Sequence, residues 1–376
     1  MQKAFAQQKK LIVVALAAAT FSSPTLAETA NVSVYGTADM SLDFINTGDA
    51  ANGTAGVSKN AVSSNVSKLG FKGSEGLSEG LSAIWQIEQQ INIDGTGTST
   101  FATRNSFAGL KSDAAGTVLL GRHDTPYKLA TRKLDVFGDN IADNRALLGA
   151  VSGKSAAAAF DGRQPDVIAY ISPAMSGFTG AIAYVNLNET ATAAATATNF
   201  ATQGKASALS LAGMYDAAPF YGSLGYEDHK LDTVRAGGKE SAWKLGLGYT
   251  MEAFTLGFAY EKTSDNLTVA SGANRYGHNA YYLSGQYKFG SDAVKFAYGK
   301  AGQLASSANT GANQYSLGYD HGLSKRTKLY ALYSRLSNQS AASYGFSQST
   351  ATTGNATING VGASPSVFSF GMKHTF

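Results

Sequence analysis

The fold class is decided by residues 241–262, which read SAWKLGLGYTMEAFTLGFAYEK. Large apolar side chains stand at every second position of both halves, and small, hydroxyl or charged residues lie between them. A period of two is typical of a β-strand with one apolar and one polar face. The apolar positions are Trp243, Leu245, Leu247 and Tyr249, followed by Phe254, Leu256, Phe258 and Tyr260.

The same alternation extends in both directions along the chain. It starts at Asn31, recurs at 294–298 and 315–319, and ends with 367–376. These segments run for about ten residues, as tilted membrane strands require, whereas strands of soluble proteins usually have about five or six. The polar face carries Gly, Ser, Thr and charges, which suit a watery lumen better than a packed core. Aromatic residues gather near the strand ends, as they do at membrane interfaces.

The connections between these segments are of two kinds. Short turns alternate with long polar loops, which is typical of outer-membrane barrels with short periplasmic turns. The short turns are Ala114-Ala115-Gly116, Met175-Ser176-Gly177 and Ala217-Ala218-Pro219. The long loops run from Asp49 to Asn65, Glu189 to Lys205, Asn266 to Asn279 and Ser337 to Ser364.

The N-terminal region is predicted to be a secretory signal peptide, residues 1–27. Lys3, Lys9 and Lys10 precede the apolar run 11–19, which is far shorter than the roughly twenty residues of a membrane span. Small residues follow at the right spacing for cleavage, so we expect the mature chain to begin at Glu28. Removing three lysines lowers the formal net charge from +4 to +1, and no basic face indicates nucleic-acid binding.

Composition supports an exported all-β chain. Of the 376 residues, 44% are hydrophobic and 15% are charged, which is unlike a disordered chain or a typical soluble enzyme. Cysteine is absent, so disulfides and thiolate chemistry are excluded. We count roughly sixteen alternating segments in hairpin order, enough for an antiparallel barrel that encloses an aqueous channel. Residues 28–376 are predicted to form this transmembrane domain, with no cofactor and no metal.

Four stretches resemble the trimeric general-diffusion porins of proteobacteria. They are Val34-Tyr35-Gly36, Ser67 to Gly73 (SKLGFKG), Arg104 to Lys111 (RNSFAGLK) with Leu120-Gly121-Arg122, and the terminal strand that ends in Phe376. The likeness spans essentially the whole mature chain. It implies a barrel of about 16 strands in the outer membrane, a homotrimer, and passive passage of ions and small hydrophilic solutes. It further implies contact with outer-membrane lipid and lipopolysaccharide.

The resemblance also implies that the third external loop, Thr125 to Gly162, folds into the barrel as a constriction. Thr125 can cap a short helix with Pro126 at its first position, and Gly138 is expected to end it. In the family, loop acids face a ladder of basic wall residues. The loop acids here are Asp135, Asp139 and Asp143.

The candidate wall residues are Lys68, Arg104 and Arg122. Lys68 is opposite in parity to Leu69, and Arg104 to Phe107, so both are expected to face the lumen. Arg122 shares parity with Leu120, and only the family position or a bulge turns it inward. The inward orientation is favoured, because a charge on the lipid face costs roughly 2–4 kcal/mol at the midplane.

The loop sequence does not decide between anion and cation preference. The loop lacks the commoner Pro-Glu-Phe-Gly-Gly sequence, and its basic residues offset the acids: Lys128, Arg132, Lys133 and Arg145. At the other end of the chain, Phe376 resembles the signal read by the barrel assembly machinery.

Three alternatives remain. A barrel enzyme would need a catalytic pair, but the adjacent residues His123 and Asp124 point to opposite faces of a strand. Ser241 and Lys244 have the spacing of a penicillin-binding motif but lie in a predicted strand rather than a helix. A substrate-specific channel would keep the fold and add a selective lumen lining. A secreted adhesive β-sandwich is the third alternative, and the long strands disfavour it.

Overall fold

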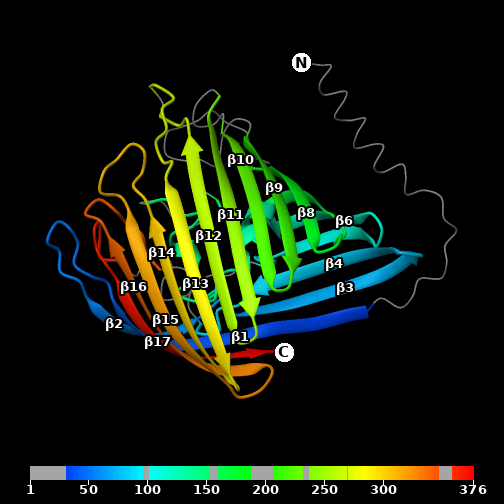
Figure 1. Cartoon of the computed structure of the whole chain (residues 1–376), viewed down its shortest axis with the longest axis horizontal. Coiled ribbons are helices and arrows are strands. Elements are labelled where there is room, and N and C mark those ends of the chain that lie inside the picture. Colours follow the sequence, from blue (N-terminus) through cyan, green and yellow to red (C-terminus); the bar gives the residue numbers. More distant parts are fainter. Residues whose placement is uncertain are drawn as a thin grey trace.

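The computed structural model describes residues 31–95, 101–152, 160–187, 206–231, 237–268, 270–346 and 358–376. The predicted signal peptide and the predicted loop from Glu189 to Lys205 lie outside these residues. Within them, seventeen strand segments form a single antiparallel sheet that curves around a lumen (Figure 1). Among the described residues no helix has the length and apolar character needed to cross a membrane.

The strands follow one another as hairpins around the sheet. The first eight are β1 (Asn31–Asn46), β2 (Ser58–Ser64), β3 (Lys68–Ser78), β4 (Leu81–Gln90), β5 (Ser106–Ser112), β6 (Gly116–Asp124), β7 (Arg163–Ile171) and β8 (Phe178–Asn186). The next are β9 (Ala206–Ala217), β10 (Phe220–Leu231), β11 (Lys239–Met251), β12 (Phe254–Asp265), β13 (Asn279–Phe289), β14 (Asp292–Ala301), β15 (Ala312–Gly322), β16 (Thr327–Asn338) and β17 (Ser366–Thr375). Two short helices, α2 (Pro126–Arg132) and η1 (Asn144–Ala146), stand between β6 and β7.

The barrel has sixteen strands because β2 and β3 are two halves of one. Both pair with β1, β2 along Met40–Asn46 and β3 along Asn31–Thr37. Between them Val66 takes a positive φ of 53°, and the Ser67 hydroxyl accepts a hydrogen bond from the Asp39 backbone N–H at 3.0 Å. The predicted loop from Asp49 to Asn65 is therefore wrong over β2. Its small polar residues are held by backbone pairing with β1, which a search for apolar alternation does not detect.

β1 also pairs with β17, and this pairing closes the sheet into a ring. The register runs from Thr37 opposite Thr375 to Asn46 opposite Ser366. Beyond it, the Gly36 and Phe376 backbones exchange two hydrogen bonds of 3.0 and 3.1 Å. A β-carbon at position 36 would lie 2.4 Å from the Phe376 ring, so only glycine fits there. Closure leaves no unpaired strand edge.

The distribution of polarity is inverted relative to a soluble protein. Large apolar side chains cover the outer face, while polar and charged side chains such as Asp43, Lys244 and Glu261 are fully buried inside. Leu317 on β15 and Phe370 on β17, for example, are 62% and 48% exposed. The predicted faces of the alternating segments are confirmed, and an outer apolar band of this kind matches a lipid environment.

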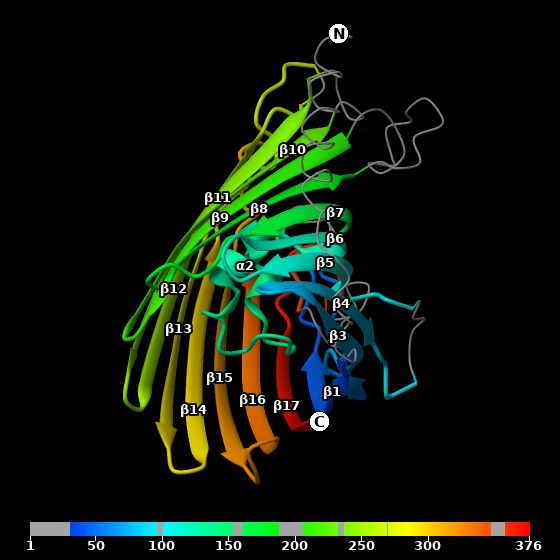
Figure 2. The same cartoon turned by 90° about the vertical axis from the view of Figure 1, so that its right-hand side faces the viewer.

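The connections also divide as predicted. The three predicted short turns lie at one end of the barrel, together with both ends of the chain's described part, and the described parts of the other predicted long loops lie at the opposite end. Figure 2 shows α2 and the loop that follows it within the curve of the sheet, at about half its height. The interior is therefore partly filled by a segment from the long-loop end.

Candidate functional site

The connection from β6 to β7, residues 125–162, enters the barrel and is called L3 here. Thr125 caps α2 through its hydroxyl, which accepts a hydrogen bond from the Lys128 backbone, and Pro126 occupies the first turn, as predicted. Lys128 to Leu134 was predicted as helical, and the helix covers this range as far as Arg132. The prediction that Gly138 ends it is wrong. Beyond Arg132 the chain turns so that Leu134 and Phe137 are buried against the wall.

L3 is tied to the inner wall by hydrogen bonds along its length. On the β9–β10 side, the Tyr127 backbone donates to Ser210 at 2.9 Å, and Tyr221 donates to the Ala130 carbonyl at 2.7 Å. Further around the wall, Ser284 on β13 donates to the Leu134 carbonyl at 2.6 Å. These bonds satisfy backbone groups of L3 that would otherwise be buried without partners.

A buried charge cluster fixes the base of L3. The Lys244 ammonium on β11 contacts Asp161 of L3 and lies 3.4 Å from Glu261 on β12. Glu261 in turn accepts hydrogen bonds from the Tyr127 hydroxyl at 2.7 Å and from the Gly149 N–H at 2.8 Å. The side chains of Lys244 and Glu261 are both 0% exposed, so the ion pair that joins L3 to the wall is buried.

The three L3 aspartates surround two arginines. Arg132 lies 3.4 Å from Asp135, 3.1 Å from Asp139 and 2.7 Å from Asp143. Arg145 lies 3.3 Å from Asp139 and 2.9 Å from Asp143. Three carboxylates against two guanidinium groups leave one excess negative charge.

The three carboxyl groups differ in exposure and in proton affinity. The side chains of Asp135 and Asp143 are 0% exposed, whereas Asp139 is 33% exposed to the lumen. Burial, together with the Asp143 carboxylate, raises the pKa of Asp135 to about 6. Burial also opposes ionisation of Asp139, but Arg132 and Arg104 outweigh it and hold the pKa of Asp139 below its ordinary value. Asp139 is thus the ionised, lumen-facing acid of the loop.

The wall across the lumen from Asp139 is basic. Lys68 at the start of β3 and Arg104 just before β5 approach Glu88 on β4, at 3.7 and 2.5 Å. Next to them, Arg163 on β7 and Lys128 share Asp124, at 3.1 and 2.7 Å. On the wall itself, three cations against two carboxylates leave an excess of one positive charge, and Lys128 of L3 adds a fourth cation. Asp139 interacts electrostatically with both Lys68 and Arg104.

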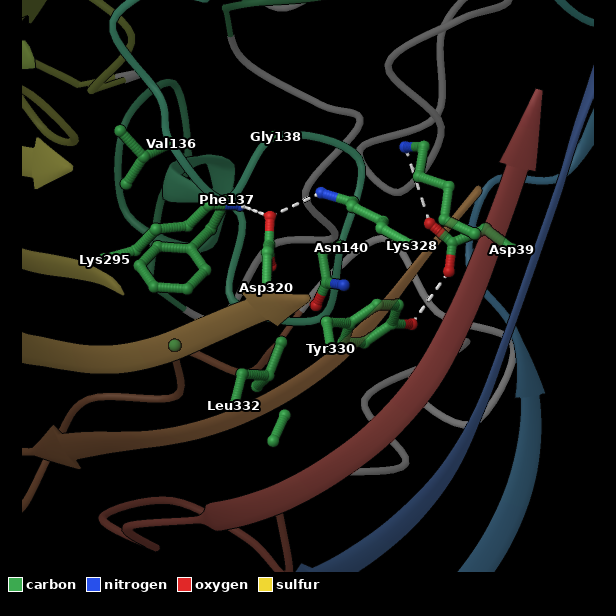
Figure 3. A pocket seen from close by; sticks show the side chains of 13 residues that line it. Asp39, Val136, Phe137, Gly138, Asn140, Lys295, Asp320, Lys328, Tyr330 and Leu332 are labelled. Atoms are coloured by element: carbon green, nitrogen blue, oxygen red, sulfur yellow. Dashed lines mark hydrogen bonds and ion pairs between the residues drawn. The ribbon is translucent and has the colours of Figure 1, made fainter. Parts of the chain in front are cut away.

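The tip of L3 also approaches the wall at β15–β17. A cavity of about 50 Å³ separates Val136, Phe137 and Asn140 from this part of the sheet. Within it, Lys295 and Lys328 converge on the Asp320 carboxylate, and the Tyr330 hydroxyl donates to Asp39 at 2.7 Å (Figure 3). The tip of L3 therefore lies close to this part of the wall, and Asp139 is not among the residues that line the gap.

Comparison with known proteins identifies the family. A family model described as Gram-negative porin matches residues 13–341. The chain belongs to the Gram-negative porin family.

Relatives span most of this porin. The outer membrane porin protein 32 of Delftia acidovorans is 25% identical over 372 residues, covering 98% of this chain and 100% of the relative. An outer membrane porin protein of Bordetella pertussis is 27% identical over 305 residues, covering 73% and 77%. The solved anion-selective porin from Comamonas acidovorans superposes with a TM-score of 0.76 at 25% identity, covering 92% of this chain and 100% of that one.

The porin is an outer-membrane diffusion channel and not an enzyme. The closed barrel, its lipid-compatible outer face and its polar lumen provide the passage, as expected from the sequence. His123 lies against the Phe107 ring and bonds its own strand backbone, and Ser241 and Lys244 stand on one strand as predicted.

The structure brings together some of the predicted site residues but not others. Lys68, Arg104 and Asp139 lie on facing sides of the lumen. Asp135 is buried against Tyr282, which donates to it at 2.7 Å, so the prediction that it lines the gap is wrong.

The predicted inward orientation of Arg122 is also wrong. It pairs with Ser106 and shares the outer face with Val118 and Leu120, and it donates to the Thr103 carbonyl at 2.9 Å. A register irregularity does occur here, but it affects the pairing of β6 with β7 and leaves the pairing of β5 with β6 regular.

Sequence reasoning missed two residues of this wall, Glu88 and Arg163. It named Lys128 as a basic residue of the loop but did not predict that Lys128 and Arg163 share Asp124. Arg163 donates to Asn105 at 2.7 Å and interacts electrostatically with Arg104. The sequence could have indicated this position of Arg163, because it is a basic residue directly after the inward loop. It is also opposite in parity to Ile168 and Tyr170, which face the lipid.

Proposed function

We propose that Lys68, Arg104 and Arg163 on the wall, and Asp139 on L3, form the charge-selective constriction of this channel. The single observation that carries the proposal is the exposed Asp139 carboxylate held in the electrostatic field of Lys68 and Arg104 across the open side of the lumen. Opposite charges on the two sides of a narrow aqueous gap orient small polar solutes and hinder apolar ones.

We further propose a preference for anions. The wall carries one excess positive charge. In L3, Lys128, Arg132 and Arg145 balance the charges of Asp135, Asp139 and Asp143, so the constriction retains a net positive charge. The anion-selective porin from Comamonas acidovorans is similar over its full length.

The test is a reversal-potential measurement across a planar bilayer with a KCl gradient and the refolded porin. The expected sign is that of chloride permeating faster than potassium. A potential of the opposite sign would contradict the anion preference. An unchanged potential in both Arg104→Gln and Asp139→Asn variants would contradict the assignment of the constriction residues.

Processing and assembly complete the proposal. Residues 1–27 are proposed to be removed at Glu28, leaving residues 28–376 as the barrel. Phe376 is proposed to be the assembly signal, and the barrel assembly machinery, lipid and lipopolysaccharide to be partners. A homotrimer is proposed because a fold neighbour, the outer-membrane protein OmpT of Vibrio cholerae, has been solved in a trimer form. Size-exclusion chromatography with light scattering in detergent tests the trimer.

A further inference from the structure

A second basic region lies in the lumen at the short-turn end, on strands other than those that carry the constriction residues. A cavity of about 450 Å³ opens there against the inner faces of β13–β17 and the turns between them. A volume of this size is typical of small-molecule sites. Its charged lining consists of Lys288, Lys295, Lys325, Arg326, Lys328 and Lys373, with Asp292 and Asp320. We call this region the basic vestibule.

The two carboxylates of the basic vestibule are already engaged. Asp320 contacts both Lys295 and Lys328 at 2.6 Å, and Asp292 contacts His321 of the next strand at 2.6 Å. Asp39, outside the lining, contacts Lys373 at 3.4 Å. Six cations against these three carboxylates leave an excess of three positive charges. Lys288, which faces the lumen because Tyr287 and Phe289 on either side of it face outward, makes no ion pair among the described residues.

The sheet register places two of these cations side by side. Lys328 on β16 and Lys373 on β17 are direct cross-strand partners. Like charges directly opposite one another destabilise a sheet. Each of the two lysines has one carboxylate partner: Asp320 lies 2.6 Å from Lys328, and Asp39 lies 3.4 Å from Lys373. Asp320 is also shared with Lys295, so the two carboxylates neutralise this group of lysines only in part. The fold thus retains a local excess of positive charge that its stability does not require.

We propose that the basic vestibule binds a small multivalent oxyanion, such as a phosphate or pyrophosphate group. An ammonium group is a compact charge with three donors, well suited to phosphoryl oxygens as a point charge. The Ser291, Ser324 and Thr327 hydroxyls on the same lining add neutral donors. Chloride, with one charge, satisfies only one or two of these cations at a time and passes through.

The position of the basic vestibule gives binding a measurable consequence. Lys295, Asp320, Lys328 and Lys373 line both this cavity and the smaller one beneath the L3 tip. A bound oxyanion therefore sits in the ion path between the short-turn mouth and L3, and it reduces the current when supplied from that mouth. This consequence rests on the channel function, and conductance in plain KCl reports that function separately.

The test uses the full porin in a planar bilayer, with pyrophosphate added to one chamber and then to the other. We expect a concentration-dependent block that is at least tenfold stronger from one chamber. Lys288→Gln should weaken it severalfold, and Lys288→Gln with Lys328→Gln should weaken it at least tenfold. Conductance in KCl shows that each variant is folded and open.

Lys111→Gln is the matched control. Lys111 lies at the same end of the lumen, on β5 of the opposite wall, and is not part of the cavity lining. It should leave the block unchanged. Equal block from both chambers would overturn the proposed site. So would a block that is unchanged in the Lys288→Gln, Lys328→Gln double variant, or one that Lys111→Gln weakens as much as the double variant does. Calorimetric titration of detergent-solubilised porin with pyrophosphate gives a second readout, and absence of binding there has the same meaning.

Discussion

Replacing Lys244 by methionine should release the base of L3. The substitution keeps the length of the side chain but removes the ammonium group that contacts Asp161 and Glu261. The side chains of Lys244 and Glu261 are 0% exposed and that of Asp161 is 8% exposed, so the two carboxylates lose their cation in an almost fully buried site.

The expected magnitude follows from this burial. Removing one partner of a buried ion pair costs about 3–5 kcal/mol. Since about 1.4 kcal/mol is a factor of ten, the ratio of docked to released L3 should fall by a factor of roughly 100 to 4,000. Glu261 would keep its hydrogen bonds from Tyr127 and Gly149, each worth about 1.5–3 kcal/mol to a charged acceptor, but it would lose the only cation that contacts it among the described residues.

Single-channel recording in planar bilayers measures the released state directly. We expect Lys244→Met to show a higher mean conductance and frequent transitions between levels, and adding Glu261→Gln and Asp161→Asn to restore most of the wild-type behaviour. Lys262→Met is the control, since Lys262 pairs with Trp243 on the outer face of β12. Recordings of Lys244→Met that match wild type in conductance and noise would refute the reasoning.

Three further predictions concern pH, selectivity and assembly. Burial raises the pKa of Asp135 to about 6, so its protonated form stabilises docked L3. This stabilisation is complete below a pH of about 4 and is lost as the pH rises through 6. Channel noise should therefore increase between pH 5 and 7 in wild type but not in Asp135→Asn. Arg104→Gln should lower the chloride-to-potassium permeability ratio by about two- to fivefold, since one unit charge at about 7 Å in water contributes roughly 0.6 kcal/mol, and reversal potentials measure this ratio. Deleting Phe376 removes the two backbone hydrogen bonds to Gly36 and should reduce the heat-stable folded fraction on semi-native gels, whereas Phe376→Tyr should preserve it.

The strands and their faces were predictable from the sequence because the lipid boundary imposes period-two alternation on side chains such as Trp243 and Leu245. β2 was missed because the lumen and the adjoining loops accept the same small polar residues, and only pairing with β1 distinguishes strand from loop there. Alternation also predicted the lumen position of Lys68.

The site was predictable only in part, because its geometry depends on L3. Asp135 and Asp139 are four residues apart and chemically identical, but Tyr282, 147 positions further along, buries the first and leaves the second exposed. Alternation alone predicted the correct outer face for Arg122. The inward orientation was favoured instead because of the free-energy cost of placing a charge in lipid. That cost applies at the midplane, whereas Arg122 stands near the end of β6 and donates to the Thr103 carbonyl.

The seam between β1 and β17 carries an entropic consequence for how the barrel forms. Thr37 and Thr375 are 338 positions apart, whereas every other neighbouring pair of strands is joined by one connection along the chain. Closing a loop of that length costs about 5 kcal/mol of chain entropy, which only the hydrogen bonds of the completed seam repay. The seam is therefore the contact of highest sequence separation and should form last. Until it forms, the chain is an open sheet with two unsatisfied edges, each a template for another molecule's strand.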